Sequence, residues 1–217
     1  PRYPLDVGVP GKRPLLNFPE ISMWGNWPWD GAGANVLPER FQRLWDQVKQ
    51  VVEGGFPYSE GIYEDMHKAI VLQFYWDRDR SAQDTLKEYI AYEYGITKPE
   101  LVEAMLAVIG ALEEASSNIY QKKPVDAQRA QRAAELAESV KSAMPAWARN
   151  SWRWEILYLR TIIDRERFAG VGIDSPAAEA AMLRLVDMYH CELETDDPYH
   201  HRVRPPLKRA VDRQGRK

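Results

Sequence analysis

The chain has 217 residues, of which 45% are hydrophobic and 28% charged, so a disordered or low-complexity protein is excluded for most of its length. Its formal net charge of -3 provides no overall attraction to nucleic acids or membrane surfaces. No apolar run approaches the roughly 20 residues that span a bilayer, and the single cysteine, Cys191, has no partner for an internal disulfide.

The first 37 residues are rich in proline and glycine, which excludes a long helix there. Residues 15–24 form the only strand-like run of this stretch, and Pro19 predicts that the strand ends or is interrupted. A lone strand is not stable, so we expect its sheet partners to lie upstream. Because the chain begins at Pro1 without Met or a signal-peptide pattern, we expect it to be the C-terminal part of a longer protein.

From residue 38 onward, apolar residues recur with helical spacing. Capping and helix-breaking residues divide this part into seven predicted helices, which begin at about Pro38, Ser59, Ser81, Thr97, Val125, Trp152 and Ser175. Gly54 and Gly95 are the predicted stops of the first and third helices. The connections are short, which predicts mostly antiparallel neighbours and hence a helical bundle.

Three of the eight tryptophans, Trp24, Trp27 and Trp29, lie within six residues of a segment that glycine and proline prevent from being helical. Exposed indole rings stack on the apolar faces of sugars, and a glycine-rich loop after a strand is where parallel sheets place ligand contacts. The alternative is that these rings pack between two parts of the protein.

Two carboxylates lie near these aromatic residues. Glu20 is on the strand-like run, and Glu60 follows Tyr58 at a predicted helix start. Paired carboxylates carry out the acid and base steps of glycoside hydrolysis. In the alternative interpretation, Glu60 only stabilises the N-terminus of its helix, and Glu20 pairs with a cation.

Other chemistry-bearing residues form no convincing site. Glu64 and His67 have the Glu-x-x-His spacing of di-iron bundles, and Asp187 with His190 repeats it with an aspartate. The inward carboxylates that such a site needs from two further helices are not well placed, so we interpret these residues as solvated helix faces with a Glu64 to Lys68 pair. We therefore predict no metal site and no cofactor. The basic tail is interpreted as a solvated terminus with no nucleic-acid partner.

Three segments resemble a known family: Leu-Asn-Phe-Pro-Glu-Ile-Ser-Met-Trp-Gly at 16–25, Phe-Pro-Tyr-Ser-Glu-Gly-Ile-Tyr-Glu-Asp-Met-His-Lys at 56–68, and Gln-Phe-Tyr-Trp-Asp at 73–77. They resemble the C-terminal part of bacterial glycoside-hydrolase-like proteins related to the α-glucuronidase and β-hexosaminidase barrels. The resemblance covers roughly residues 15–112. It implies a (β/α)8 catalytic barrel followed by a helical region, and a periplasmic or extracellular location.

Under this resemblance, the fold is mainly α: a helical bundle preceded by the last strand, loop and helix of a truncated barrel. Residues 1–53 are then the end of the upstream barrel, 54–196 the helical C-terminal region and 197–217 a disordered basic tail. The resemblance implies that the barrel mouth holds the substrate-binding residues, which are Glu20, Trp24, Trp27, Trp29, Tyr58 and Glu60.

The resemblance also implies a function. We expect the C-terminal fragment of a carbohydrate-active enzyme that hydrolyses glycosidic bonds and is inactive alone, because the upstream strands carry most of the catalytic acids. Its partners are then a carbohydrate substrate and the upstream barrel of the same chain. The alternative is a non-catalytic helical module that binds a partner protein or a glycan.

Overall fold

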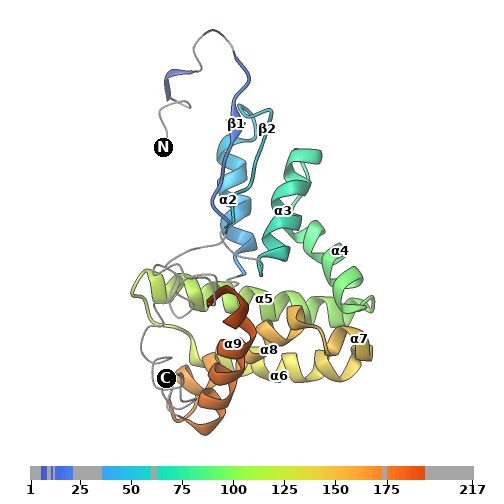
Figure 1. The fold of residues 1–217 in the computed structure, drawn as a ribbon, viewed down its shortest axis with the longest axis vertical. Coiled ribbons are helices and arrows are strands. Elements are labelled where there is room, and N and C mark those ends of the chain that lie inside the picture. Colours follow the sequence, from blue (N-terminus) through green and yellow to red (C-terminus); the bar gives the residue numbers. More distant parts are fainter. Residues whose placement is uncertain are drawn as a thin grey trace.

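The computed structural model describes residues 6–8, 11, 13–21, 36–59, 63–172 and 175–193 (Figure 1). Within these ranges the chain forms eight helices and one two-stranded parallel sheet, and 69% of the residues are helical. The prediction of a mainly α protein is confirmed. No helix in the described ranges is long and apolar enough to cross a membrane. The predictions for Trp24, Trp27, Trp29, Glu60 and the tail 197–217 lie outside the described residues.

The sheet consists of two parallel strands joined along the chain by a helix. Strand β1 (Leu16–Asn17) pairs with β2 (Gly54–Gly55), and α2 (Pro38–Val48) lies between them in sequence. An isolated parallel bridge between Glu20 and Tyr58 continues the same register beyond Pro19, so the predicted interruption at this proline is confirmed.

The expectation that the sheet partners lie upstream misses β2, which lies downstream. Gly54-Gly55 followed by Pro57 is typical of a turn, which is why the sequence predicts a helix stop there. The glycine is required for a different reason, since a Cβ atom on Gly55 would lie 2.2 Å from the carbonyl oxygen of Asn17 and 2.6 Å from the hydroxyl of Tyr75. Close packing of two strands and a helix therefore explains Gly55.

Helices α2, α3 (Asp65–Trp76) and α4 (Ala82–Tyr94) pack against one another beside the sheet. The ring of Trp45 on α2 stacks on Phe74 of α3 with centroids 5.4 Å apart, and its indole N–H donates to the carbonyl of Arg78 at 2.9 Å. At the start of α4, the Ser81 hydroxyl accepts the Asp84 N–H at 3.0 Å, which confirms the predicted cap, and the same hydroxyl donates to the Asp84 carboxylate at 2.7 Å.

The remaining helices form the bundle: α5 (Pro99–Tyr120), α6 (Ala127–Ala143), the short α7 (Ala146–Arg149), α8 (Trp152–Phe168) and α9 (Pro176–Leu193). Helix α5 packs on α6, α6 on α8, and α8 on α9. In Figure 1, α5, α6 and α8 run across the lower half of the molecule, and β1, β2 and α2 stand above them. The alanine-rich face of α6 is buried, as the sequence predicts, at Ala130, Ala134, Ala137 and Val140.

One hydrophobic core connects β1, α2 and β2, together called the sheet unit, to the bundle. The same cluster of buried side chains contains Ile21 at the end of the first strand, Phe41 of α2, Leu112 of α5 and Trp154 of α8. A smaller cluster joins Tyr63 to α8 and α9. Because the larger core is continuous, the position of the strand ends is set by the bundle as well as by the sheet.

Candidate functional site

The carboxyl ends of the two parallel strands form an edge at which Glu20 and Tyr58 lie side by side. The Ile21 N–H donates to the Tyr58 carbonyl at 2.8 Å, and the Tyr58 N–H donates to the Pro19 carbonyl at 2.8 Å. Residues paired in this way project from the same face of a sheet. Both side chains are exposed, Tyr58 by 41%. The structure therefore brings together the two predicted substrate-binding residues that it describes.

The other four predicted substrate-binding residues, Trp24, Trp27, Trp29 and Glu60, lie outside the described residues. Along the chain, the tryptophan segment follows Ile21 and Glu60 follows Ser59. Both connections therefore start from the carboxyl ends of the paired strands, the edge where parallel sheets bind ligands.

Glu64 is a buried carboxyl group beside the same edge, with 2% of its surface exposed. The Ser59 hydroxyl donates to its Oε2 atom at 2.8 Å, and Lys68 Nζ lies 4.0 Å from that oxygen. Burial raises the pKa of Glu64, Ser59 and Lys68 lower it, and the charge of Glu20 raises it. On balance the pKa of Glu64 is raised, so this buried carboxyl group near Glu20 holds a proton more readily than an exposed glutamate does.

The prediction that Ser59 caps a helix is wrong. Helix α3 begins at Asp65, its N-cap is Glu64, and the Ser59 hydroxyl donates to the carboxylate of Glu64. This hydrogen bond between Ser59 and Glu64 therefore connects the end of the second strand to the start of α3. A serine hydroxyl is a common helix cap, so the sequence favours that role for Ser59. Only the tertiary arrangement shows which acceptor its hydroxyl contacts.

The interpretation of Glu64 and His67 as part of a solvated helix face is also wrong, since each is 2% exposed. His67 Nε2 accepts the Leu37 N–H at 2.9 Å, and Nδ1 lies 2.8 Å from the Ile21 carbonyl oxygen. Both ring nitrogens are thus engaged with the backbone. Among the described residues no group of three or more His, Cys, Asp or Glu side chains is arranged to hold a metal ion.

A second buried glutamate, Glu113, binds backbone N–H groups in the first turn of α2. Glu113 of α5 accepts the N–H groups of Glu39 and Arg40 at 2.9 and 2.8 Å. Helix N-termini leave such donors without intrahelical partners, and Leu37, the N-cap residue, makes no side-chain cap. Burial raises the pKa of Glu113, while these two hydrogen bonds lower it. No sequence signal identifies this contact, because 73 and 74 residues separate its partners.

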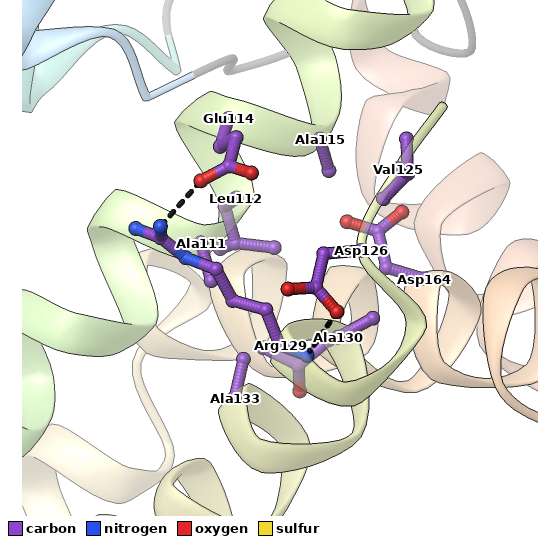
Figure 2. Close-up of a pocket in the computed structure, with 11 residues that line it drawn as sticks. Ala111, Leu112, Glu114, Ala115, Val125, Asp126, Arg129, Ala130, Ala133 and Asp164 are labelled. Carbon is purple, nitrogen blue, oxygen red and sulfur yellow. Dashed lines mark hydrogen bonds and ion pairs between the residues drawn. The ribbon is translucent and has the colours of Figure 1, made fainter. Parts of the chain in front are cut away.

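A small cavity lies between α5, α6 and α8, and Figure 2 shows the side chains around it. Three of its charged side chains, Glu114, Asp126 and Arg129, already have partners. Glu114 pairs with Arg129, and Asp126 caps its own helix by accepting the N–H groups of Gln128 and Arg129. With room for little more than a water molecule, this cavity is too small for a sugar ring.

Asp164 also lines this cavity, and its Oδ2 atom is buried without a hydrogen-bond partner in the described part of the chain. Burial raises the pKa of Asp164 to about 6, against the opposing charges of Arg160 and Arg167. Those two arginines come from the same helix. Asp164 and the two arginines therefore belong to the interior of the helical bundle. The carboxyl edge of the strands remains the better candidate site.

Comparisons of the chain with protein-family models, curated proteins and solved structures find no match.

Proposed function

We propose that the chain is the C-terminal part of a carbohydrate-active enzyme that hydrolyses glycosidic bonds in the intact protein and is inactive alone. In this proposal β1, α2 and β2 belong to the wall of a (β/α)8 barrel, and α5 to α9 form a helical region that packs against it. The substrate-binding residues are Glu20, Trp24, Trp27, Trp29, Tyr58 and Glu60. The catalytic acid and base are supplied mainly by upstream strands.

The observation that carries the proposal is the pairing of Glu20 with Tyr58 at the carboxyl ends of two parallel strands. Enzymes built on parallel sheets and barrels bind substrate at this edge, because the loops that leave it converge there. A carboxylate accepts hydrogen bonds from sugar hydroxyls, and a tyrosine ring stacks on the apolar face of a sugar. Both groups are exposed at this edge.

The uncovered face of the sheet supports the barrel part of the proposal. Leu16, on β1, is 52% exposed, and Phe18 and Phe56, which directly follow β1 and β2, are 69% and 63% exposed. On the opposite face, Leu15 packs against the core and Tyr75 of α3 contacts Gly55. Parallel sheets normally have both faces covered, and two strands alone are only marginally stable. Further parallel strands with inward side chains would cover this face, as in a barrel.

The test uses the intact protein, obtained by recovering the coding sequence upstream of Pro1 and assaying hydrolysis of xylo-, cello- and chito-oligosaccharides. The variant Glu20→Gln keeps the size of the side chain and removes its charge. We expect it to lower turnover or affinity at least tenfold, about 1.4 kcal/mol, and to leave the unfolding free energy within about 1 kcal/mol. Glu60→Gln should behave in the same way.

The matched control is Glu53→Gln, since Glu53 is an exposed glutamate at the amino end of the second strand. It should leave hydrolysis unchanged. Equal activity of the Glu20 and Glu53 variants would remove Glu20 from the site. An upstream sequence without repeated strand and helix units bearing paired carboxylates would contradict the enzymatic proposal as a whole.

A second candidate function is a non-catalytic helical module that binds a partner protein or a glycan. The extent of the bundle favours it, because five of the eight helices in the described residues belong to α5 to α9. This alternative predicts that residues 38–196 fold and bind without the upstream portion. Oligosaccharide binding without hydrolysis by the intact protein would favour it over the enzyme.

A further inference from the structure

The first turn of α3 contacts the chain on both sides of residues 22–36. The imidazole of His67 meets the carbonyl of Ile21, the last described residue of the first strand, with Nδ1 and oxygen 2.8 Å apart. Its other nitrogen, Nε2, accepts the N–H of Leu37, directly before α2, at 2.9 Å. One buried ring thus joins two backbone groups that are 16 residues apart along the chain, counting from 21 to 37.

The two contacts define the protonation state of the ring. Nε2 accepts a hydrogen bond, so it carries no proton, and the proton of the neutral ring is on Nδ1, which donates to the Ile21 carbonyl. A charged imidazolium would have two N–H donors and would lose the contact with Leu37. The neutral form is therefore the only one that makes both hydrogen bonds.

The surroundings of the ring favour the same neutral form. Burial lowers the pKa of His67 to about 4, the Ile21 carbonyl opposes this shift, and the positive charges of Arg160 on α8 and Arg40 on α2 lower the pKa further. The uncharged ring of Phe41 on α2 packs against the imidazole with centroids 4.7 Å apart. Neutral pH therefore leaves the two hydrogen bonds intact.

We infer that His67 is a positioning residue, which sets the spacing between the two ends of residues 22–36 and thereby holds Glu20, the neighbour of Ile21, at the carboxyl edge of the strands. Glu64, the N-cap residue of α3, accepts a hydrogen bond from Ser59, which directly follows Tyr58 at the end of the second strand. The first turn of α3 thus supports both strand ends. The hydrogen-bond role stands on the geometry alone, and its consequence for carbohydrate binding rests on the proposed function.

Glu113 provides a matched control for this inference. It is also buried and also accepts backbone N–H groups at the start of α2, and the two groups that donate to it, from Glu39 and Arg40, both belong to α2. A residue that merely anchors α2 should behave like Glu113. A residue that positions the strand end should differ from it.

The first experiment uses the 217-residue chain labelled with nitrogen-15. Ring-nitrogen spectra report the tautomer of His67 between pH 4 and pH 8, and amide hydrogen exchange reports protection at Leu37 and across residues 22–36. The variants are His67→Leu, which removes both hydrogen bonds, His67→Gln, whose amide supplies one donor and one acceptor without titrating, and Glu113→Gln.

We expect the wild-type ring to stay neutral, with its proton on Nδ1, down to about pH 5. His67→Leu should increase exchange at Leu37 at least tenfold, His67→Gln should restore most of the protection at every pH, and Glu113→Gln should leave Leu37 unchanged. If His67→Leu does not fold, the wild-type titration and the exchange data for His67→Gln test the positioning role instead. A ring that titrates near pH 6.5 without change at Leu37, or equal loosening by Glu113→Gln, would overturn the inference.

The second experiment measures binding of xylohexaose and chitohexaose to the intact protein. His67→Leu should weaken binding at least tenfold, whereas His67→Gln should stay within about threefold of wild type and show no loss at acidic pH. Failure of the wild-type protein to bind either oligosaccharide would count against the proposed function, while the exchange data would still decide the role of His67. Equal binding by wild type and His67→Leu would overturn the positioning role.

Discussion

The helical bundle and the sheet unit bury their apolar residues differently. In the bundle, α8 places Trp154, Ile156 and Ile163 in the interior with 1%, 1% and 0% of their surface exposed. On the sheet, Ile21 is fully buried but Phe18, three residues before it, is 69% exposed. The helices of the bundle bury their apolar faces against one another, whereas only one face of the two strands is covered.

This difference indicates that the bundle mainly provides stability and that the sheet unit carries the candidate site. Close-packed interiors are explained by stability, and they tolerate little change in volume. Parallel sheets normally have both faces covered, and they bind ligands at the carboxyl edge of their strands. The candidate site accordingly lies on the sheet unit, and the bundle supports it through the shared core and through Glu113.

The largest expected effect comes from truncating the buried indole of the bundle. Trp154→Ala should lower the unfolding free energy by about 3–5 kcal/mol, because it leaves a cavity in the core. Urea denaturation monitored by circular dichroism measures this loss.

The control for that prediction is Phe18→Ala on the exposed sheet face, which should change the stability of the 217-residue chain by about 0.5 kcal/mol or less. In the intact protein the same change should cost about 3 kcal/mol, since upstream strands would then bury the ring. Equal effects in both contexts would show that nothing covers this face.

The next effect is the pH dependence of stability from His67. Its pKa is about 4 in the folded chain and 6.5 as the ordinary value, so the unfolded chain takes up the proton first on acidification. Stability should therefore fall between pH 6.5 and pH 4 by about 3 kcal/mol, since each unit of pKa shift corresponds to about 1.36 kcal/mol. Denaturation curves of wild type and His67→Gln measure this, and an identical acid loss in both would contradict it.

Asp164 in the bundle should act in the opposite direction. Its pKa is about 6 in the folded chain against 3.8 ordinarily, so the folded chain keeps a proton that the unfolded chain releases. Stability from this group should fall as the pH rises from about 4 to 6, by about 2–3 kcal/mol. Asp164→Asn should remove that slope, and the acid loss caused by His67 should then stand out more clearly. Persistence of the slope would assign it to another carboxyl group.

The smallest effect concerns the contact between the two regions. Glu113→Gln replaces a carboxylate oxygen by an amide group that cannot accept the second N–H of α2, so it should lower stability by about 1–2 kcal/mol. Chemical denaturation at pH 7 checks this. No change would indicate that water replaces the lost acceptor.

Local patterns predicted several elements well. The cap at Ser81, the stop at Gly95 with its φ of +64°, and the alanine-rich face of α6 are confirmed. Each depends on residues within one or two turns of a helix, where spacing and capping chemistry decide the structure. The start of α5 differs by one residue, since Lys98 is its N-cap where the sequence favours Thr97.

For the candidate site, the sequence placed Glu20 correctly on a strand-like run but missed the strand that leads to Tyr58. Residues 54–58 read as a turn, because glycine and proline disfavour a strand, yet they pair with the first strand. Ser59 was expected to cap a helix, and its hydroxyl instead donates to Glu64.

By itself, then, the sequence determined that the protein is mainly helical, where most helices begin, and which residue types are available for chemistry. The tertiary structure alone decided that Glu20 lies beside Tyr58, that His67 joins Ile21 to Leu37, and that Glu113 caps a helix 73 residues away. The physical reason is range. Helix periodicity and capping act over a few residues, whereas strand pairing and buried hydrogen bonds join groups whose separation along the chain leaves no local pattern.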